Sequence, residues 1–240
     1  MIPPFCAMLL LVGCIDTGLS PVEPELVVQG SAVPESFEVR DGWVVELRRA
    51  DLAFGPLYLC AGAQAGDLCE VARGEFLRSI TIDALDPEPR SIGTFPALDG
   101  PTRSAMWDYG YTWDLTEQMP APTEAGEELQ ASVVLEGTAR RDDDVVDFLA
   151  EVVIAPNREG LVIVRAPNAF EHSIDDNDRL VVSVDPEGWL SGVRFDDLVD
   201  AERPDGQPAT FSEDGQPWRS VSNALTTREQ PSLEWVRGAR

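Results

Sequence analysis

The chain has 240 residues, of which 43% are hydrophobic, and its 43 acidic against 18 basic residues give a formal net charge of −25. Every basic residue is an arginine, and the absence of lysine excludes chemistry that needs a side-chain amine, such as Schiff-base formation or a Walker-type phosphate site. So acidic a chain lacks the basic surface of nucleic-acid-binding proteins, and we expect no nucleic-acid partner. A solubilising acidic surface explains the charge, with cation binding as the alternative.

The N-terminus contains an apolar run over residues 5–12. The run is shorter than the ~20 residues of a membrane-spanning helix and is typical of the hydrophobic region of a signal peptide. It ends in Leu11-Val12-Gly13-Cys14, which resembles the lipobox of bacterial lipoproteins.

The resemblance implies that residues 1–13 are a lipoprotein signal peptide and that the Cys14 thiol carries lipid, palmitate included. The protein would then be anchored to a membrane of the cell envelope. Ile15 follows the cysteine instead of Asp, which by enteric sorting rules indicates the outer membrane.

Prolines predict that residues 14–36 form a flexible tether after the lipidated cysteine. Pro21, Pro24 and Pro34 interrupt this segment, and its one apolar run, residues 26–28, adds at most an edge strand. We expect the β-rich globular domain to span residues 37–240.

Two cysteines, Cys60 and Cys69, remain in the mature chain besides Cys14. Their spacing closes a short loop that a disulfide can span, and such a bond persists in an oxidising compartment. A zinc site is the weaker alternative because further Cys or His ligands are missing nearby. The disulfide and the lipobox therefore both predict a location in the cell envelope, outside the cytoplasm.

Period-2 hydrophobic patterns predict two hairpins. In the first, Phe37 and Val39 precede an Asp41-Gly42 turn and an alternating run over residues 43–47. In the second, residues 131–135 and 146–154 alternate on either side of a turn at residues 140–144.

Shorter strands are expected at residues 52–60, 91–98, 161–165, 180–184 and 233–236, whereas residues 68–85 are ambiguous. Helical turns are expected at residues 195–199 and 218–225. Nine or ten short strands against one or two short helices predict an all-β, antiparallel β-sandwich-like single domain.

An aromatic stripe places four rings at every second residue: Trp107, Tyr109, Tyr111 and Trp113. On one extended strand all four would face the same side, as a stacking platform for a sugar, peptide or partner strand. The alternative, which we favour, is that they are the core face of a strand.

The single histidine lies in an acidic segment with His172, Asp175, Asp176 and Asp178. These side chains could form a metal site, although Arg179 breaks the calcium-loop pattern. An Asp- and Asn-rich turn before a strand explains the same residues and is the interpretation we favour.

Motifs for catalysis are missing: the sequence has no G-x-S-x-G, no H-E-x-x-H and no glycine-rich phosphate loop. We expect no cofactor and a non-enzymatic binding or accessory lipoprotein, with an envelope protein or glycan as partner. A metal-handling lipoprotein using His172 is the first alternative. A carboxylate-dependent hydrolase is the second, since paired acids remain available.

Overall fold

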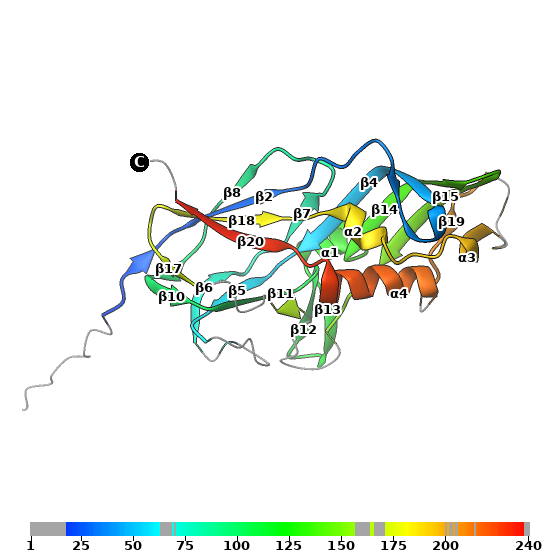
Figure 1. Ribbon diagram of the computed structural model, residues 1–240. Helices are drawn as coiled ribbons and strands as arrows, with labels where there is room; N and C mark the ends of the chain where they lie inside the picture. The colour runs from blue at the N-terminus through cyan, green and yellow to red at the C-terminus, as the bar shows by residue number, and fades with distance from the viewer. Residues whose placement is uncertain are drawn as a thin grey trace, which may run out of the picture.

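The computed structural model describes residues 18–62, 69, 71–156, 164–165, 171–199, 201, 204, 206–213 and 215–237. These residues are mostly antiparallel β-strands with a few short helices, which confirms the predicted all-β, sandwich-like class (Figure 1). The predicted signal peptide and Cys14 lie outside the described residues, as does most of the strand expected at 161–165.

The described strands form three larger sheets. The first has the order β1 (Pro21–Val22), β9 (Ala97–Leu98), β6 (Ala72–Phe76), β5 (Leu57–Cys60), β11 (Ser104–Trp107), β16 (Val164–Arg165). The second has the order β19 (Ala209–Thr210), β15 (Asp144–Val152), β14 (Val133–Arg141), β4 (Val44–Phe54), β3 (Phe37–Glu38), with β7 (Ile80–Asp83) also on β4. The third has the order β20 (Ser232–Arg237), β18 (Asp178–Ser183), β2 (Glu25–Gln29), β8 (Arg90–Thr94).

Two-stranded ribbons and short helices complete the described fold. The ribbons pair β10 (Gly100–Thr102) with β17 (His172–Ile174), and β12 (Tyr111–Asp114) with β13 (Met119–Pro122). The helices are α1 (Glu124–Leu129), α2 (Pro186–Leu190), α3 (Asp196–Val199) and α4 (Gln216–Asn223). A 3-10 turn covers Arg40–Gly42, and a π-helical turn, Ala224–Arg228, extends α4.

Both predicted hairpins are confirmed. β14 and β15 pair antiparallel from Val133↔Val152 to Arg141↔Asp144, around the expected turn. β3 pairs with the start of β4, and Asp41 and Gly42 between them both have positive φ, as expected of a tight Asp-Gly turn. At both hairpins, the alternation of apolar residues and the turn residues predicted the observed pairing.

The predicted tether boundary at residue 36 is wrong, because β2 belongs to the folded domain. β2 lies inside the third sheet, parallel to β18 on one side and antiparallel to β8 on the other. Leu26, Val27 and Val28 are all buried. A continuous apolar run is typical of a strand that is covered on both faces, and not of an edge strand.

Helices α3 and α4 match the two predicted helical turns, whereas α1 and α2 were not predicted. Each of these begins at a capping residue: Thr123 accepts from the Gly126 amide, and Asp185 accepts from the Glu187 amide. At six and five residues, α1 and α2 are too short for periodicity alone to reveal them.

Large aromatic side chains fill the core between β4, β15 and the segment before α3. The ring of Phe195 lies 5.8 Å from that of Trp43 and 5.2 Å from that of Phe148, centroid to centroid. All three are fully buried. Fully burying such side chains contributes roughly 1.5–3 kcal/mol each, which makes this cluster a main stabilising feature of the second sheet.

The aromatic stripe does not form one face. Trp107 and Tyr109 are fully buried, whereas Tyr111 and Trp113 lie half-buried on the β12–β13 ribbon. Gly110 separates the two pairs with φ +71°, and a Cβ there would lie 2.4 Å from the Cβ of Ala53. The core interpretation therefore holds for Trp107 and Tyr109, and the single-strand platform is wrong because the chain turns at Gly110.

The buried Tyr109 hydroxyl donates to the Leu225 carbonyl oxygen at 2.7 Å, joining the stripe to the π-helical turn. We expect Tyr109→Phe to lower the free energy of unfolding by about 1–3 kcal/mol, because the bond is lost inside the core. Tyr111→Phe is the matched control and should have little effect. Urea denaturation measures both, and equal losses would contradict the interpretation.

Candidate functional site

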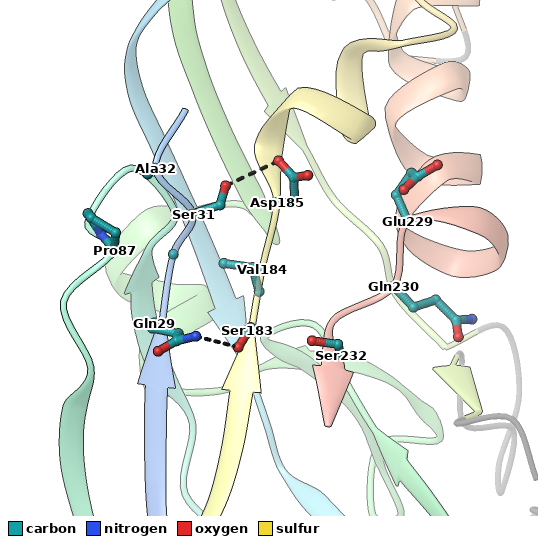
Figure 2. Close-up of a pocket in the computed structure, with 11 residues that line it drawn as sticks. Gln29, Ser31, Ala32, Pro87, Ser183, Val184, Asp185, Glu229, Gln230 and Ser232 are labelled. Carbon is teal, nitrogen blue, oxygen red and sulfur yellow. Dashed lines mark hydrogen bonds between the residues drawn. The ribbon is translucent and has the colours of Figure 1, made fainter. Parts of the chain in front are cut away.

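A surface pocket of about 400 Å³ opens where the parallel strands β2 and β18 end (Figure 2). Its polar lining consists of carboxylates, amides and hydroxyls, with Pro87, Ala32 and Val184 as the apolar part. The polar residues that matter most are Gln29, Ser31, Ser183, Asp185, Glu229 and Gln230.

The first wall follows from the in-register parallel pairing of β2 with β18. Gln29 and Ser183 are register partners, and Gln29 Nε2 donates to Ser183 Oγ at 2.9 Å. Just beyond the strands, Ser31 Oγ donates to Asp185 Oδ1 at 3.1 Å (Figure 2). Parallel strands end at the same sheet edge, so these side chains converge there.

The second wall is the chain that leaves the π-helical turn. The Glu229 amide donates to the Ala224 carbonyl at 2.8 Å, and Gln230 Nε2 donates to the Thr226 carbonyl at 2.8 Å. Trp189 Nε1 of α2 donates to the Glu229 carbonyl at 3.2 Å. These bonds hold Glu229 across the pocket from β2.

Glycine at position 188 allows the Glu229 carboxylate to approach α2 closely. A Cβ on Gly188 would lie 2.7 Å from Glu229 Oε2. The carboxylate therefore rests against the backbone of α2, the helix that Asp185 caps.

The charge of the pocket is uncompensated. Its lining contains two carboxylates, Asp185 and Glu229, and no arginine. Across the described part of the chain, neither carboxylate forms an ion pair. The pocket thus presents negative charge to solvent.

A second pocket of about 430 Å³ lies at the opposite ends of the same two strands; Glu25, Arg179 and Asp176 there have protein partners, whereas the buried Asp178 Oδ1 has none among the described residues. Arg179 Nε lies 2.5 Å from Glu25 Oε2, and Ser91 also donates to the Glu25 carboxylate. The hydrogen bonds to Glu25 lower its pKa, that from Ser91 most. Asp176 Oδ1 accepts from the Glu23 amide at 3.1 Å. Because Arg179 neutralises Glu25 there, this pocket is the weaker candidate for a charged ligand.

The predicted metal residues are only partly brought together. His172 Nε2 lies 2.7 Å from Asp178 Oδ2, which also accepts from the Asp175 amide at 2.8 Å. The Asp175 carboxylate accepts from the Asn177 amide, and the Asp176 carboxylate accepts from the amide of Glu23, just before β2. No three His, Cys, Asp or Glu side chains in the described ranges are arranged to hold a metal ion. The structure uses these carboxylates to build the turn before β18.

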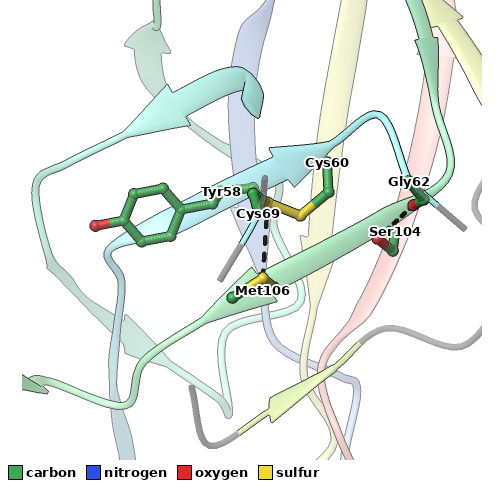
Figure 3. Close-up of a disulfide and its surroundings, with 6 residues drawn as sticks. All are labelled: Tyr58, Cys60, Gly62, Cys69, Ser104 and Met106. Carbon is green, nitrogen blue, oxygen red and sulfur yellow. Dashed lines mark hydrogen bonds between the residues drawn. A yellow bond between two sulfur atoms is a disulfide. The ribbon is translucent and has the colours of Figure 1, made fainter. Parts of the chain in front are cut away.

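Cys60 and Cys69 form the predicted disulfide, with their Cα atoms 5.4 Å apart (Figure 3). Cys60 ends β5, and Cys69 Sγ lies 3.6 Å from Met106 Sδ on the adjacent β11. The bond closes the loop at one end of the first sheet and packs against that sheet.

Asp108 is a buried acid in the turn between Trp107 and Tyr109. Burial raises the pKa of its carboxyl to about 6, while a hydrogen bond from Thr112 opposes the shift. The negative charge of Asp108 in turn helps burial to raise the pKa of Tyr58. Asp108 lines neither of the two pockets described above, and its raised pKa couples folding stability to pH.

The pocket residues were not singled out by sequence patterns. Asp185-Pro186 carries a helix-start signal that could have marked one of them. Gln29 and Glu229 carry no such signal, because the residues with which they form the pocket are distant in sequence.

No protein-family model matches the chain, and no curated protein is similar to it. Among solved structures, MbnP from Methylosinus trichosporium matches over 92% of this chain and 99% of that chain, with a TM-score of 0.45 and 11% sequence identity. Nothing about ligand or activity follows from so distant a likeness. Within the described residues, no helix has the length and apolar character needed to cross a membrane.

Removing the disulfide should destabilise the fold. We expect the double change Cys60→Ala and Cys69→Ala to cost roughly 2–3 kcal/mol, because the short loop is no longer closed in the unfolded chain. Thermal unfolding measures the loss, and dithiothreitol should lower the Tm of the wild type but not that of the variant. An equal response of both proteins to the reductant would contradict the prediction.

Asp108 should make stability depend on pH. Its pKa is raised from 3.8 to about 6 in the folded chain, so the folded state holds this proton more tightly than the unfolded state. Stability therefore falls as pH rises from about 4 to about 6, by about 3 kcal/mol in total.

Asp108→Asn should remove this dependence and raise stability at pH 7 by a similar amount, with the gain vanishing below about pH 4. Asp114→Asn is the opposite control, since bonds from the Glu117 and Thr116 amides lower the pKa of Asp114. That variant should gain nothing at pH 7. Chemical denaturation at pH 7 and at about pH 4 measures the stability of both variants. A higher stability of Asp114→Asn at pH 7, or no increase for Asp108→Asn, would refute the assignment.

Proposed function

We propose that the protein is a lipid-anchored lipoprotein of the cell envelope that acts as a non-enzymatic binding module. The observation that carries the binding function is the pocket at the ends of β2 and β18, with uncompensated carboxylates on both walls. The lipobox that ends at Cys14 supports the anchor. The Cys60–Cys69 disulfide supports an oxidising compartment.

The position of the pocket suits an anchored receptor. Residues 15–20 span at most about 20–25 Å even when fully extended, so a lipid on Cys14 would keep the domain near the membrane. β2 and β18 both run away from the N-terminal end of the domain (Figure 1). The pocket at their far ends would then face solutes and not the bilayer.

The size of the pocket limits its occupant. About 400 Å³ lies at the lower end of the range for small-molecule sites. A small solute fits, as does a single terminal group of an envelope glycan or protein. Outer-membrane placement follows from Ile15 and remains part of the proposal.

Hydrolysis is the less favoured alternative, although the pocket does hold two carboxylates. A glycosidase needs one of its acids in an apolar, buried setting so that it can donate a proton. Asp185 is exposed and accepts hydrogen bonds from Ser31 and from the Glu187 amide. This arrangement suits binding better than proton transfer.

Cys14→Ser should move the protein from the detergent phase to the aqueous phase in Triton X-114 partitioning, because the lipid can no longer be attached. Cys6→Ser is the matched control: it changes a cysteine inside the predicted signal peptide and should leave partitioning unchanged. Detergent-phase recovery of the Cys14→Ser protein would overturn the anchor.

A further inference from the structure

We propose that the pocket at the ends of β2 and β18 binds a small organic cation through a primary ammonium group. The inference deepens the proposed binding function and rests on it. It follows from three features of the lining: which donors and acceptors are already bonded within the protein, the two carboxylates, and the lack of arginine and aromatic side chains.

Three of the pocket's side chains already donate a hydrogen bond within the protein, whereas the hydroxyls of Ser183 and Ser232 donate to no acceptor in the described structure. Gln29 Nε2 donates to Ser183, Ser31 Oγ donates to Asp185, and Gln230 Nε2 donates to the Thr226 carbonyl. The nearby backbone amides of residues 30, 31, 184 and 229 also have protein acceptors. The charged groups that remain for a ligand are all acceptors, namely the carboxylates of Asp185 and Glu229.

The pocket offers both charged and neutral acceptors. The carboxylates of Asp185 and Glu229 flank the opening, and the amide oxygens of Gln29 and Gln230 have no protein donor in the described structure. A ligand that offers several donors and a positive charge satisfies such a site best. A primary ammonium has three N–H donors and makes charge-assisted bonds to carboxylates.

The lining also discriminates against other ligands. Quaternary ammonium groups lack N–H donors and are recognised by aromatic faces, and no aromatic side chain lines the pocket. An anion would meet two carboxylates without an arginine. A neutral polyol can donate hydrogen bonds but gains nothing from the charge.

Isothermal titration calorimetry of the purified full-length chain tests the proposal with three probes of matched length: 1,4-diaminobutane, 1,4-butanediol and succinate. We expect measurable binding of the diamine only, weakening as salt is raised. Asp185→Asn and Glu229→Gln should each reduce its affinity about tenfold or more. Asparagine retains the capping function at position 185, so the variant should still fold, as thermal unfolding will show.

Glu151→Gln is the charge control, because it removes the same charge from an exposed site on β15 in the second sheet. It should leave diamine affinity within about twofold of the wild type. An equal loss for Glu151→Gln would show that only the overall charge matters, and would overturn the pocket assignment.

The other outcomes also decide the question. Equal binding of butanediol and diamine would overturn the ammonium class while leaving a binding module intact. Carboxylate-dependent binding of Ca²⁺ without diamine binding would make the pocket an inorganic cation site. If no probe binds, the inference fails, whereas the lipid anchor stands or falls separately on the Cys14→Ser partitioning.

Discussion

The parallel pairing of β2 with β18 is the constraint on which the rest of the structure depends. Three side-chain pairs hold its register from one end to the other: Glu25 with Arg179, Gln29 with Ser183, and Ser31 with Asp185. A slip of one residue between the two strands would separate every one of these pairs. Most of the chain lies between the two strands, so the pocket forms only when both ends of the fold are in place.

The π-helical turn after α4 makes the other half of the pocket equally dependent on the core. Tyr109, buried in the segment after β11, donates to Leu225 inside that turn, and Trp189 of α2 donates to the Glu229 carbonyl. The wall that bears Glu229 is thereby tied to two separate buried aromatic side chains. A wall fixed in this way loses little freedom when a ligand binds, which favours affinity in a small pocket.

Sequence patterns predicted those parts of the fold that are determined locally. The Asp41-Gly42 hairpin and the β14–β15 hairpin join neighbouring segments, and their alternation and turn residues are sufficient to identify them. β2 was misjudged because its partner β18 lies far along the chain and no local signal reports a parallel pairing. The aromatic stripe was misjudged because one left-handed residue, Gly110, interrupts an otherwise regular alternation. The candidate site was beyond prediction for the same reason as β2, since it combines ordinary polar residues from three distant segments.

The distribution of arginines explains why the pocket stays negative. With 18 arginines for 43 acids, most carboxylates cannot be paired, and several arginines are used across the outer face of the second sheet, as in Arg48 with Glu136 and Arg140 with Glu46. Such exposed pairs contribute little stability, but they place that positive charge away from the pocket at the ends of β2 and β18. The negative field of the whole surface attracts any cation and raises its encounter rate, and salt screens it. Selection among cations must therefore come from hydrogen-bond geometry inside the pocket, where converging acceptors distinguish an ammonium group from a cation without N–H donors.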